Sequence, residues 1–203
     1  AWLRGEALPP EQAAPLYVRD KVAFTTAERQ RGEGGNPKAR STLAPLVPQA
    51  LTDADLDDVV ALEANVQSFP WTRGNFADAL AAGYGAWTLR RDGRLAGFCI
   101  LMFAPDVAHL LVIAVARDLH RQGLGSLLLD WCEQQARERG LDGVLLEVRP
   151  SNTSAVAFYK DRGYLQIGLR RGYYPAEKGG REDALVMQKR LDTAAAAPLG
   201  AAA

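Results

Sequence analysis

Residues 110–140 read LLVIAVARDLHRQGLGSLLLDWCEQQARERG, a strand-like run joined to a helical run by a short segment that contains glycine. The run LLVIAVA is apolar throughout, which is typical of a strand in the centre of a sheet. From Gly123 to Arg139 apolar and charged residues recur at helical spacing and Gly140 follows, so we predict an amphipathic helix. The predicted apolar face comprises Leu124, Leu127, Leu128, Trp131 and Cys132, and the polar face Asp130, Glu133, Gln134, Arg137 and Glu138.

Gly123 and Gly125 stand at the start of this predicted helix. A helix N-terminus presents unpaired backbone N–H groups and the positive end of the helix dipole, and both favour an anion. Without Cβ atoms the backbone can approach a phosphate closely. A tight turn with small residues for close packing explains the same glycines, and the pattern alone leaves both interpretations open. The spacing matches neither the dinucleotide fingerprint GxGxxG nor a P-loop.

The flanking sequence predicts one mixed α/β domain. Thr52 and Thr72 are of the type that begins helices, and Asp92-Gly93 between two strand-like runs is a strong hairpin signal. GVLLEVRP (143–150) is a further strand, SNTSAVAFYKDRG (151–163) a short helix, and YLQIGLRR (164–171) and EDALVMQKRL (182–191) two final strands. We predict an α/β fold with a mixed, largely antiparallel central sheet flanked by helices.

Composition restricts the class of protein. Among 203 residues, Lys+Arg and Asp+Glu number 24 each, so net charge gives no argument for binding nucleic acid or a membrane. The longest apolar runs are of strand length and the first residues lack the pattern of a secretory signal, so we expect a cytoplasmic protein. Cys99 and Cys132 lie in apolar stretches without a His or Cys cluster, which predicts reduced core residues and no metal site. Residues 1–42 are predicted to form a mostly irregular arm, and residues 192–203 an Ala-rich tail.

Four separated blocks carry a resemblance to a known family. VARDLHRQGLGSLLLDWCEQQARERG is similar to motif A of the GCN5-related N-acetyltransferases (GNAT), and VRPSNTSAVAFYKDRGY to their next motif. Together with FPWT and RRGYYPAEKGGREDALVMQKRL, these blocks resemble the RimI-type ribosomal-protein-alanine N-acetyltransferases over residues 42–191 or so. His120 departs from the pattern, since the family usually has Gln or Arg at that position.

The resemblance implies the GNAT fold, with acetyl-CoA as the donor. It implies that strand backbone at Ile113, Ala114 and Val115 pairs with the pantetheine arm and that Asn152 contacts the cofactor near its thiol. The residues that it assigns to the pyrophosphate are Arg121, Gln122, Gly123, Leu124, Gly125 and Ser126.

Acetyl transfer to an amine requires a neutral amine and a proton for the departing thiolate. An α-amine has a pKa of about 7.7–8.0, against about 10.4 for lysine, so one carboxylate is an adequate base for a protein N-terminus. Glu147 is the single charge inside the apolar run GVLLEV. From periodicity alone it is an outward-facing residue or a partner of Arg149, whereas the resemblance makes it the base. Tyr159 is likewise either a core aromatic residue or, by the resemblance, the general acid.

The acceptor side is less defined by sequence. Tyr173 and Tyr174 in RRGYYP, and Trp71 in FPWT, are either walls of the acceptor groove or ordinary packing residues. His109 has no partner signal and is assigned no role.

Three functions remain open at this point. The resemblance implies acetylation of the N-terminal alanine of a small-subunit ribosomal protein, and a GNAT enzyme acting on a small-molecule amine or on another protein N-terminus is the alternative. Residues 7–31, ALPPEQAAPLYVRDKVAFTTAERQR, also resemble the C-terminal tail of the TsaB subunit of a tRNA-modification system. The arm could therefore dock on such a partner, be the remnant of a fusion, or result from a mis-assigned start codon.

Overall fold

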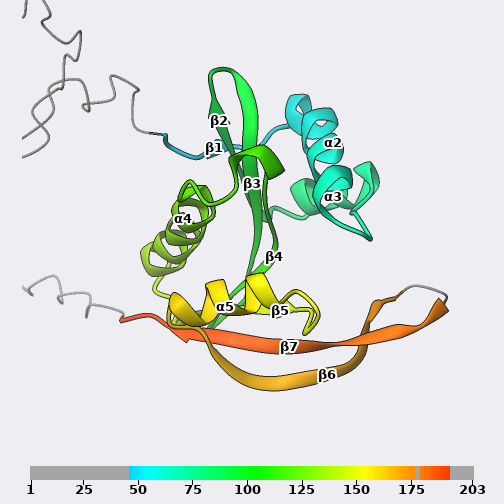
Figure 1. The fold of residues 1–203 in the computed structure, drawn as a ribbon. Coiled ribbons are helices and arrows are strands. Elements are labelled where there is room, and N and C mark those ends of the chain that lie inside the picture. Colours follow the sequence, from blue (N-terminus) through cyan, green and yellow to red (C-terminus); the bar gives the residue numbers. More distant parts are fainter. Residues whose placement is uncertain (1–45, 177–178, 193–203) are drawn as a thin grey trace, which may run out of the picture. The chain divides into compact units, whose positions relative to one another are not determined.

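A computed structural model describes residues 46–176 and 179–192, and within them the chain forms a seven-stranded sheet with helices on both faces (Figure 1). The strands are β1 (Gln49–Ala50), β2 (Gly85–Arg91), β3 (Arg94–Phe103), β4 (Ala108–Val115), β5 (Gly143–Val148), β6 (Leu165–Pro175) and β7 (Arg181–Arg190). The helices are α2 (Leu56–Val66), α3 (Arg73–Ala81), α4 (Leu124–Glu138) and α5 (Thr153–Asp161), with 3₁₀ turns η3 (Asp53–Asp55) and η4 (Arg117–Leu119). The described residues do not include the predicted arm or residues 193–203 of the predicted tail. The prediction that the arm docks on a partner therefore falls outside them.

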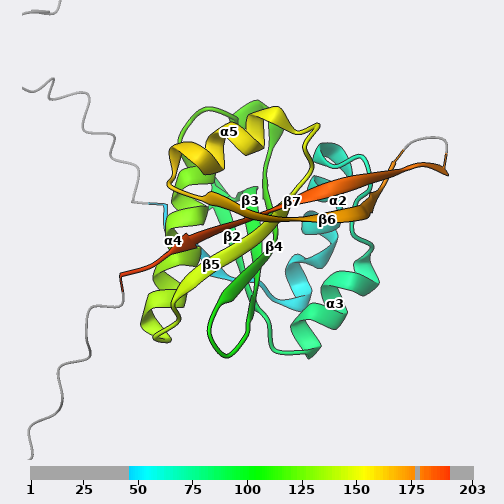
Figure 2. The same cartoon turned by 90° about the horizontal axis from the view of Figure 1, so that it is seen from below.

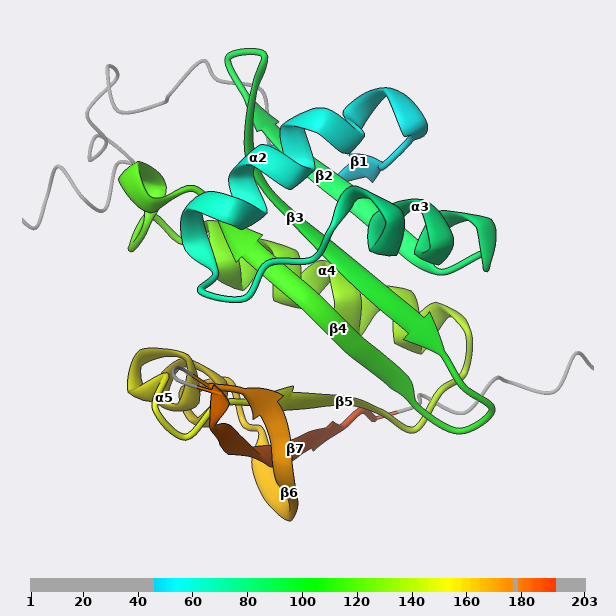
Figure 3. The same cartoon turned by 90° about the vertical axis from the view of Figure 1, so that its right-hand side faces the viewer.

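The strand order β1-β2-β3-β4-β5-β7-β6 places β4 in the middle of the sheet, as its apolar sequence predicted. All neighbouring strands pair antiparallel except β4 and β5, which confirms the predicted mixed, largely antiparallel sheet. β4 and β5 pair only from Ala108–Leu110 to Val144–Leu146. Beyond that short contact the two strands diverge, as Figure 3 shows. In Figure 1, β6 and β7 run across the direction of β2, β3 and β4, and Figure 2 shows the same strands from below.

Two apolar layers hold the helices against the sheet. β3 contributes to both, because its alternate residues point to opposite faces: Cys99 and Leu101 join the layer under α4 and α5, and Phe98 and Ile100 the layer under α2 and α3. Both cysteines are free and buried, as predicted. Because β3 is buried on both faces, its sequence is a continuous apolar run.

Local signals in the sequence explain where elements begin and turn. The Thr72 hydroxyl accepts the N–H of Asn75 and caps α3, as predicted. Asp92 and Gly93 have φ of +52° and +78°, the left-handed conformations of a tight hairpin turn. Thr52 caps a 3₁₀ turn instead of an α-helix, since η3 precedes α2. Among the described residues there is no helix with both the length and the apolar character to cross a membrane.

Glu133 contradicts the predicted polar face of α4. Only 2% of the residue is exposed, and Lys189 of β7 contacts its carboxylate. Lys189 Nζ lies 2.9 and 2.7 Å from the two carboxylate oxygens, and an Arg137 nitrogen lies 3.3 Å from one of them. Helical periodicity alone cannot reveal a buried charge whose partner comes from a distant strand.

The Lys189→Met variant is expected to lose about 3 kcal/mol of unfolding free energy. Removing one partner of a buried ion pair costs about 3–5 kcal/mol because the other charge stays buried, and the remaining Arg137 contact favours the low end. Urea unfolding measures the change, and the exposed Lys160→Met on α5 is the matched control. A loss equal to that of the control would show that the Lys189–Glu133 ion pair contributes nothing to the unfolding free energy.

Candidate active site

The divergence of β4 and β5 forms the wall of a cavity of about 420 Å³. The cavity brings together side chains from both strands, from α2 and the segment that follows it, from α5 and from the end of β6. Of the residues selected from the sequence, it is lined by Trp71, Ile113, Glu147, Asn152, Tyr159, Tyr173 and Tyr174. Residues that are up to about 100 positions apart in the chain therefore meet at one place.

One edge of β4 has no strand partner where the strand passes this cavity. Ile113, Ala114 and Val115 pair with β3 on one side, but on the other side β4 has no strand partner beyond Leu110. A register shift opposite Ile100 and Leu101 marks a β-bulge at the point where the strands part. An extended ligand can therefore add to this edge of β4 through main-chain hydrogen bonds. That these three residues pair with the pantetheine arm stays a prediction.

The glycine segment at the start of α4 leaves the N-terminus of this helix without a side-chain cap. Arg121 and Gly123 have φ of +59° and +82°, and Gly123 is the N-cap of α4. The first N–H groups of the helix are thus free to bind an anion. A Cβ built on Gly125 meets only the Phe158 ring, at an ordinary 3.8 Å. Nothing within the described protein therefore requires glycine at position 125, whereas a closely approaching phosphate would.

The side chains around this segment are partly occupied by protein contacts. His120 Nε2 lies 2.9 Å from the Val115 carbonyl oxygen, so the residue that departs from the family pattern anchors the segment to the end of β4. Gln122 accepts from Arg91 at 2.6 Å and donates to the Asp118 carbonyl at 3.3 Å. Gln122 would therefore contribute its backbone, not its side chain, to a pyrophosphate.

Glu147 is an enclosed carboxylate held by two basic side chains. Its side chain on β5 is 6% exposed, His109 Nε2 contacts Oε2, and Arg170 Nε lies 3.0 Å from Oε1. The alternative of a pair with Arg149 is wrong, since Arg149 Nη1 instead binds Glu182 at 3.0 Å. His109, to which the sequence assigned no role, orients Glu147. Parallel β4–β5 pairing places His109 opposite Leu145, and no signal in a single sequence reports that register.

Tyr159 belongs to the core and to the cavity at once. Its ring packs beside Phe158 and Tyr164 at centroid distances of 5.3 and 5.6 Å, and the residue is 7% exposed. No hydrogen bond joins its hydroxyl to another described residue. Burial raises the pKa of Tyr159 above its ordinary value, so the phenol keeps its proton over the working pH range.

Asn152 is the N-cap of α5. Its Oδ1 accepts from the Ala155 N–H at 3.1 Å and from the Ser154 hydroxyl at 3.0 Å. The cap occupies the oxygen, so the amide nitrogen is the part of the side chain left to meet a ligand in the cavity.

Aromatic residues form the remaining walls. Tyr173 and Tyr174 pack edge to face at 4.9 Å, and the Arg149 guanidinium lies 4.2 Å from the centre of the Tyr174 ring. Burial raises the pKa of Tyr174. Trp71 is half-buried against Phe76, at 5.3 Å. All three aromatic residues therefore pack against the protein and also face the cavity.

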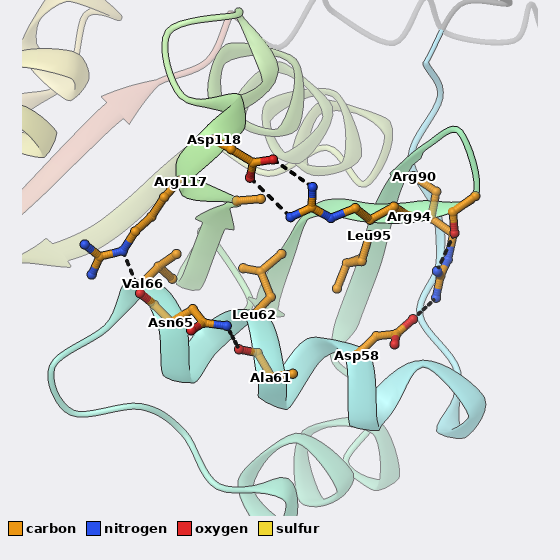
Figure 4. A pocket seen from close by; sticks show the side chains of 12 residues that line it. Asp58, Ala61, Leu62, Asn65, Val66, Arg90, Arg94, Leu95, Arg117 and Asp118 are labelled. Atoms are coloured by element: carbon orange, nitrogen blue, oxygen red, sulfur yellow. Dashed lines mark hydrogen bonds and ion pairs between the residues drawn. The ribbon is translucent and has the colours of Figure 1, made fainter.

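A second, larger cavity of about 720 Å³ lies between α2 and the β2–β3 hairpin (Figure 4). Its charged side chains are already paired: Arg94 with Asp118 at 2.7 Å, and Arg90 with Asp58 at 2.9 Å. Arg117 Nε donates to the Asn65 carbonyl at 2.6 Å. These pairs leave few polar groups to bind a ligand. Although this cavity is the larger of the two, it is therefore not the candidate active site. Across residues 46–176 and 179–192, no group of three or more His, Cys, Asp or Glu side chains could hold a metal ion.

Comparison with known proteins identifies the family to which the chain belongs. Residues 55–164 match the model of the acetyltransferase (GNAT) family. The chain belongs to this family and is an acetyl-CoA-dependent N-acetyltransferase.

Relatives within the family share one named activity. The chain is 38% identical over 138 residues to the [ribosomal protein bS18]-alanine N-acetyltransferase of Escherichia coli (strain K12), covering 68% of this chain and 93% of that protein. The enzyme of the same name from Haemophilus influenzae is 33% identical, covering 66% of this chain and 90% of that protein. The crystal structure of the ribosomal-protein-S18-alanine N-acetyltransferase from Escherichia coli superposes with a TM-score of 0.66 at 36% identity, over 71% of this chain and 92% of that one.

Proposed function

We propose that this chain transfers the acetyl group of acetyl-CoA to the α-amine of an N-terminal alanine, with ribosomal protein bS18 in the cytoplasm as its acceptor. The observation that carries the proposal is the single cavity in which Glu147, Asn152, Tyr159 and Tyr174 meet beside the free edge of β4. The names of relatives at 33–38% identity, which align over about nine-tenths of their length, support the acceptor.

The donor would be held by backbone more than by side chains. The edge of β4 at Ile113, Ala114 and Val115, which has no strand partner, would take the pantetheine arm, and the segment from Arg121 to Ser126 the pyrophosphate. The Asn152 amide would reach the cofactor near its thiol. Bound acetyl-CoA supplies an activated acetyl thioester.

Two side chains would perform the proton transfers. Glu147, oriented by His109 and Arg170, would accept a proton from the acceptor amine, directly or through water. Tyr159 would donate its hydroxyl proton to the thiolate as the C–S bond breaks. Trp71, Tyr173 and Tyr174 would form the aromatic wall against which the first acceptor residues lie.

Mass spectrometry tests the proposed acceptor. The chain is incubated with acetyl-CoA and an equimolar panel of peptides that begin with Ala, Ser or Met, together with a small polyamine. We expect one acetyl group on the α-amine of the Ala peptide, ahead of all others. Faster acetylation of the polyamine would establish the alternative of a small-molecule acceptor.

The Gly125→Ala variant is expected to weaken acetyl-CoA binding about tenfold, or about 1.4 kcal/mol. The protein has room for the added methyl group, whose neighbour is the Phe158 ring at 3.8 Å, so the loss would come from the phosphate. Calorimetry measures the affinity. Gly74→Ala, at the second residue of α3, is the matched control, whereas Gly123 is unsuitable because its φ of +82° strains any side chain. Unchanged affinity in Gly125→Ala would contradict binding of the pyrophosphate at the start of α4.

A further inference from the structure

Glu63 on α2 is a second buried carboxylate in the wall of the active-site cavity. Only 2% of the residue is exposed, yet it lines the same cavity as Glu147. Its Oε1 is approached by the Trp71 N–H at 3.5 Å, the outer limit of a hydrogen bond, and its Oε2 has no partner among the described residues. A buried carboxylate oxygen without a donor costs free energy. The geometry therefore leaves Glu63 to be completed by a group that enters the cavity.

The two carboxylates differ in their neighbours. Glu147 is compensated by Arg170 and contacted by His109, whereas no Lys, Arg or His of the described residues lies within ion-pair distance of Glu63. A cation that enters the cavity therefore gains more from Glu63 than from Glu147. The acceptor amine is such a cation, because an α-amine with a pKa of about 7.7–8.0 is mostly protonated at neutral pH.

A purely structural role for Glu63 would be to tether the segment after α2 through Trp71. The contact with the Trp71 N–H uses only Oε1 of Glu63. A glutamine side chain or a protonated glutamate would accept that N–H equally well. Burial raises the pKa of Glu63 from its ordinary value to about 7, opposed by the Trp71 N–H. The side chain is thus partly ionised at neutral pH. The other charged or titratable groups that line the cavity are Glu147, Arg149, Tyr159, Tyr173 and Tyr174.

We propose that Glu63 binds the N-terminal ammonium group of the acceptor, with Oε2 accepting one of its N–H bonds, before the proton is removed at Glu147. The inference rests on the proposed function in that the acceptor is a protein N-terminus. It separates two tasks: Glu63 binds the charged amine, and Glu147 serves as the base.

Glu63→Gln tests this role, because it keeps the size of the side chain and an oxygen for the Trp71 N–H while removing the charge. The dissociation constant of a peptide that begins with Ala is measured on the full chain saturated with CoA, which carries no acetyl group to transfer. We expect the variant to bind about tenfold more weakly at pH 7.5, and the difference to shrink at pH 6, where Glu63 is protonated, and at pH 9, where the amine is neutral. Asp57→Asn, which removes one exposed charge from the same helix, is the control and should change nothing.

A second peptide, identical except for an acetylated N-terminus, has no ammonium group and should bind the native chain and Glu63→Gln equally. A loss that is the same at all three pH values, or that persists with the acetylated peptide, would identify Glu63 as a tether of Trp71 and overturn the proposal. A loss confined to kcat and growing towards low pH would make Glu63 a base and overturn it too. A native chain that shows the expected pH dependence of binding but does not acetylate the peptide would contradict the proposed function and leave the role of Glu63 standing.

The stability of the free chain reports independently on the charge of Glu63. The raised pKa means that the folded state binds the proton of the Glu63 carboxyl more tightly than the unfolded state does. The contribution of this proton to the unfolding free energy is therefore complete at low pH and is lost as the pH rises to about 7. The slope of unfolding free energy against pH between 5 and 8 should therefore be less negative in Glu63→Gln. Identical slopes in the two proteins would show that Glu63 does not carry the buried charge on which the proposal depends.

Discussion

Replacement of Tyr159 by Phe is expected to lower kcat for acetyl transfer about 10²-fold while the affinity for acetyl-CoA stays unchanged. The hydroxyl makes no hydrogen bond to another described residue, and the ring keeps its contacts with Phe158 and Tyr164, so the fold should be unaffected. A general acid contributes about 10²–10⁴-fold. A thiol with a pKa of about 8.5 leaves as a thiolate fairly easily, so we expect the loss of kcat to be at the low end of that range.

Tyr164→Phe is the matched control for this experiment. It removes another buried hydroxyl, one that does not line the cavity. Single-turnover rates with an Ala-starting peptide separate chemistry from product release. If Tyr159→Phe turned over as fast as this control, Tyr159 would be a core aromatic residue only. Equal losses of turnover and cofactor affinity would instead mean that its hydroxyl positions acetyl-CoA.

The fold could be predicted because its signals are local. Asp92-Gly93 specifies a turn through backbone conformations that few residues adopt, and Gly123 begins a helix for the same reason. The apolar run before Gly123 forms the central strand because a strand covered on both faces has no polar side. Glu133 was misplaced because its burial depends on Lys189, 56 residues away, and helical periodicity contains no information on that contact.

The active site divides in the same way. The glycine segment and the start of α5 follow from motifs that lie within one stretch of chain, so their residues could be selected in advance. The contact between His109 and Glu147 depends on how two parallel strands align, and it became visible only in the structure. Glu63 was overlooked because a single acidic residue on a helix is usually solvent-exposed. Its burial follows from the arrangement of α2 against the sheet.

Replacement of Glu147 by Gln is expected to lower kcat/KM by about 10²-fold or more at pH 6.5, and by progressively less towards pH 9. A base is needed to deprotonate the amine, and alkaline solvent performs that step unaided. Gln has nearly the same shape and can still accept a hydrogen bond from His109, so loss of the basic oxygen is the main change. Rate–pH profiles of both forms against an Ala-starting peptide provide the measurement.

The pH trend, more than the size of the loss, assigns the base. Glu182→Gln is the matched control, because it removes a carboxylate that binds Arg149 near the cavity without lining it. If Glu147 only held His109 and Arg170 in place, its variant would run parallel to the native profile at every pH, as the control should. An ammonium-binding carboxylate acts before the amine loses its proton, and a base removes that proton. The Glu63 variant should therefore lose peptide affinity, most near pH 7.5, whereas the Glu147 variant should lose kcat/KM, most at low pH.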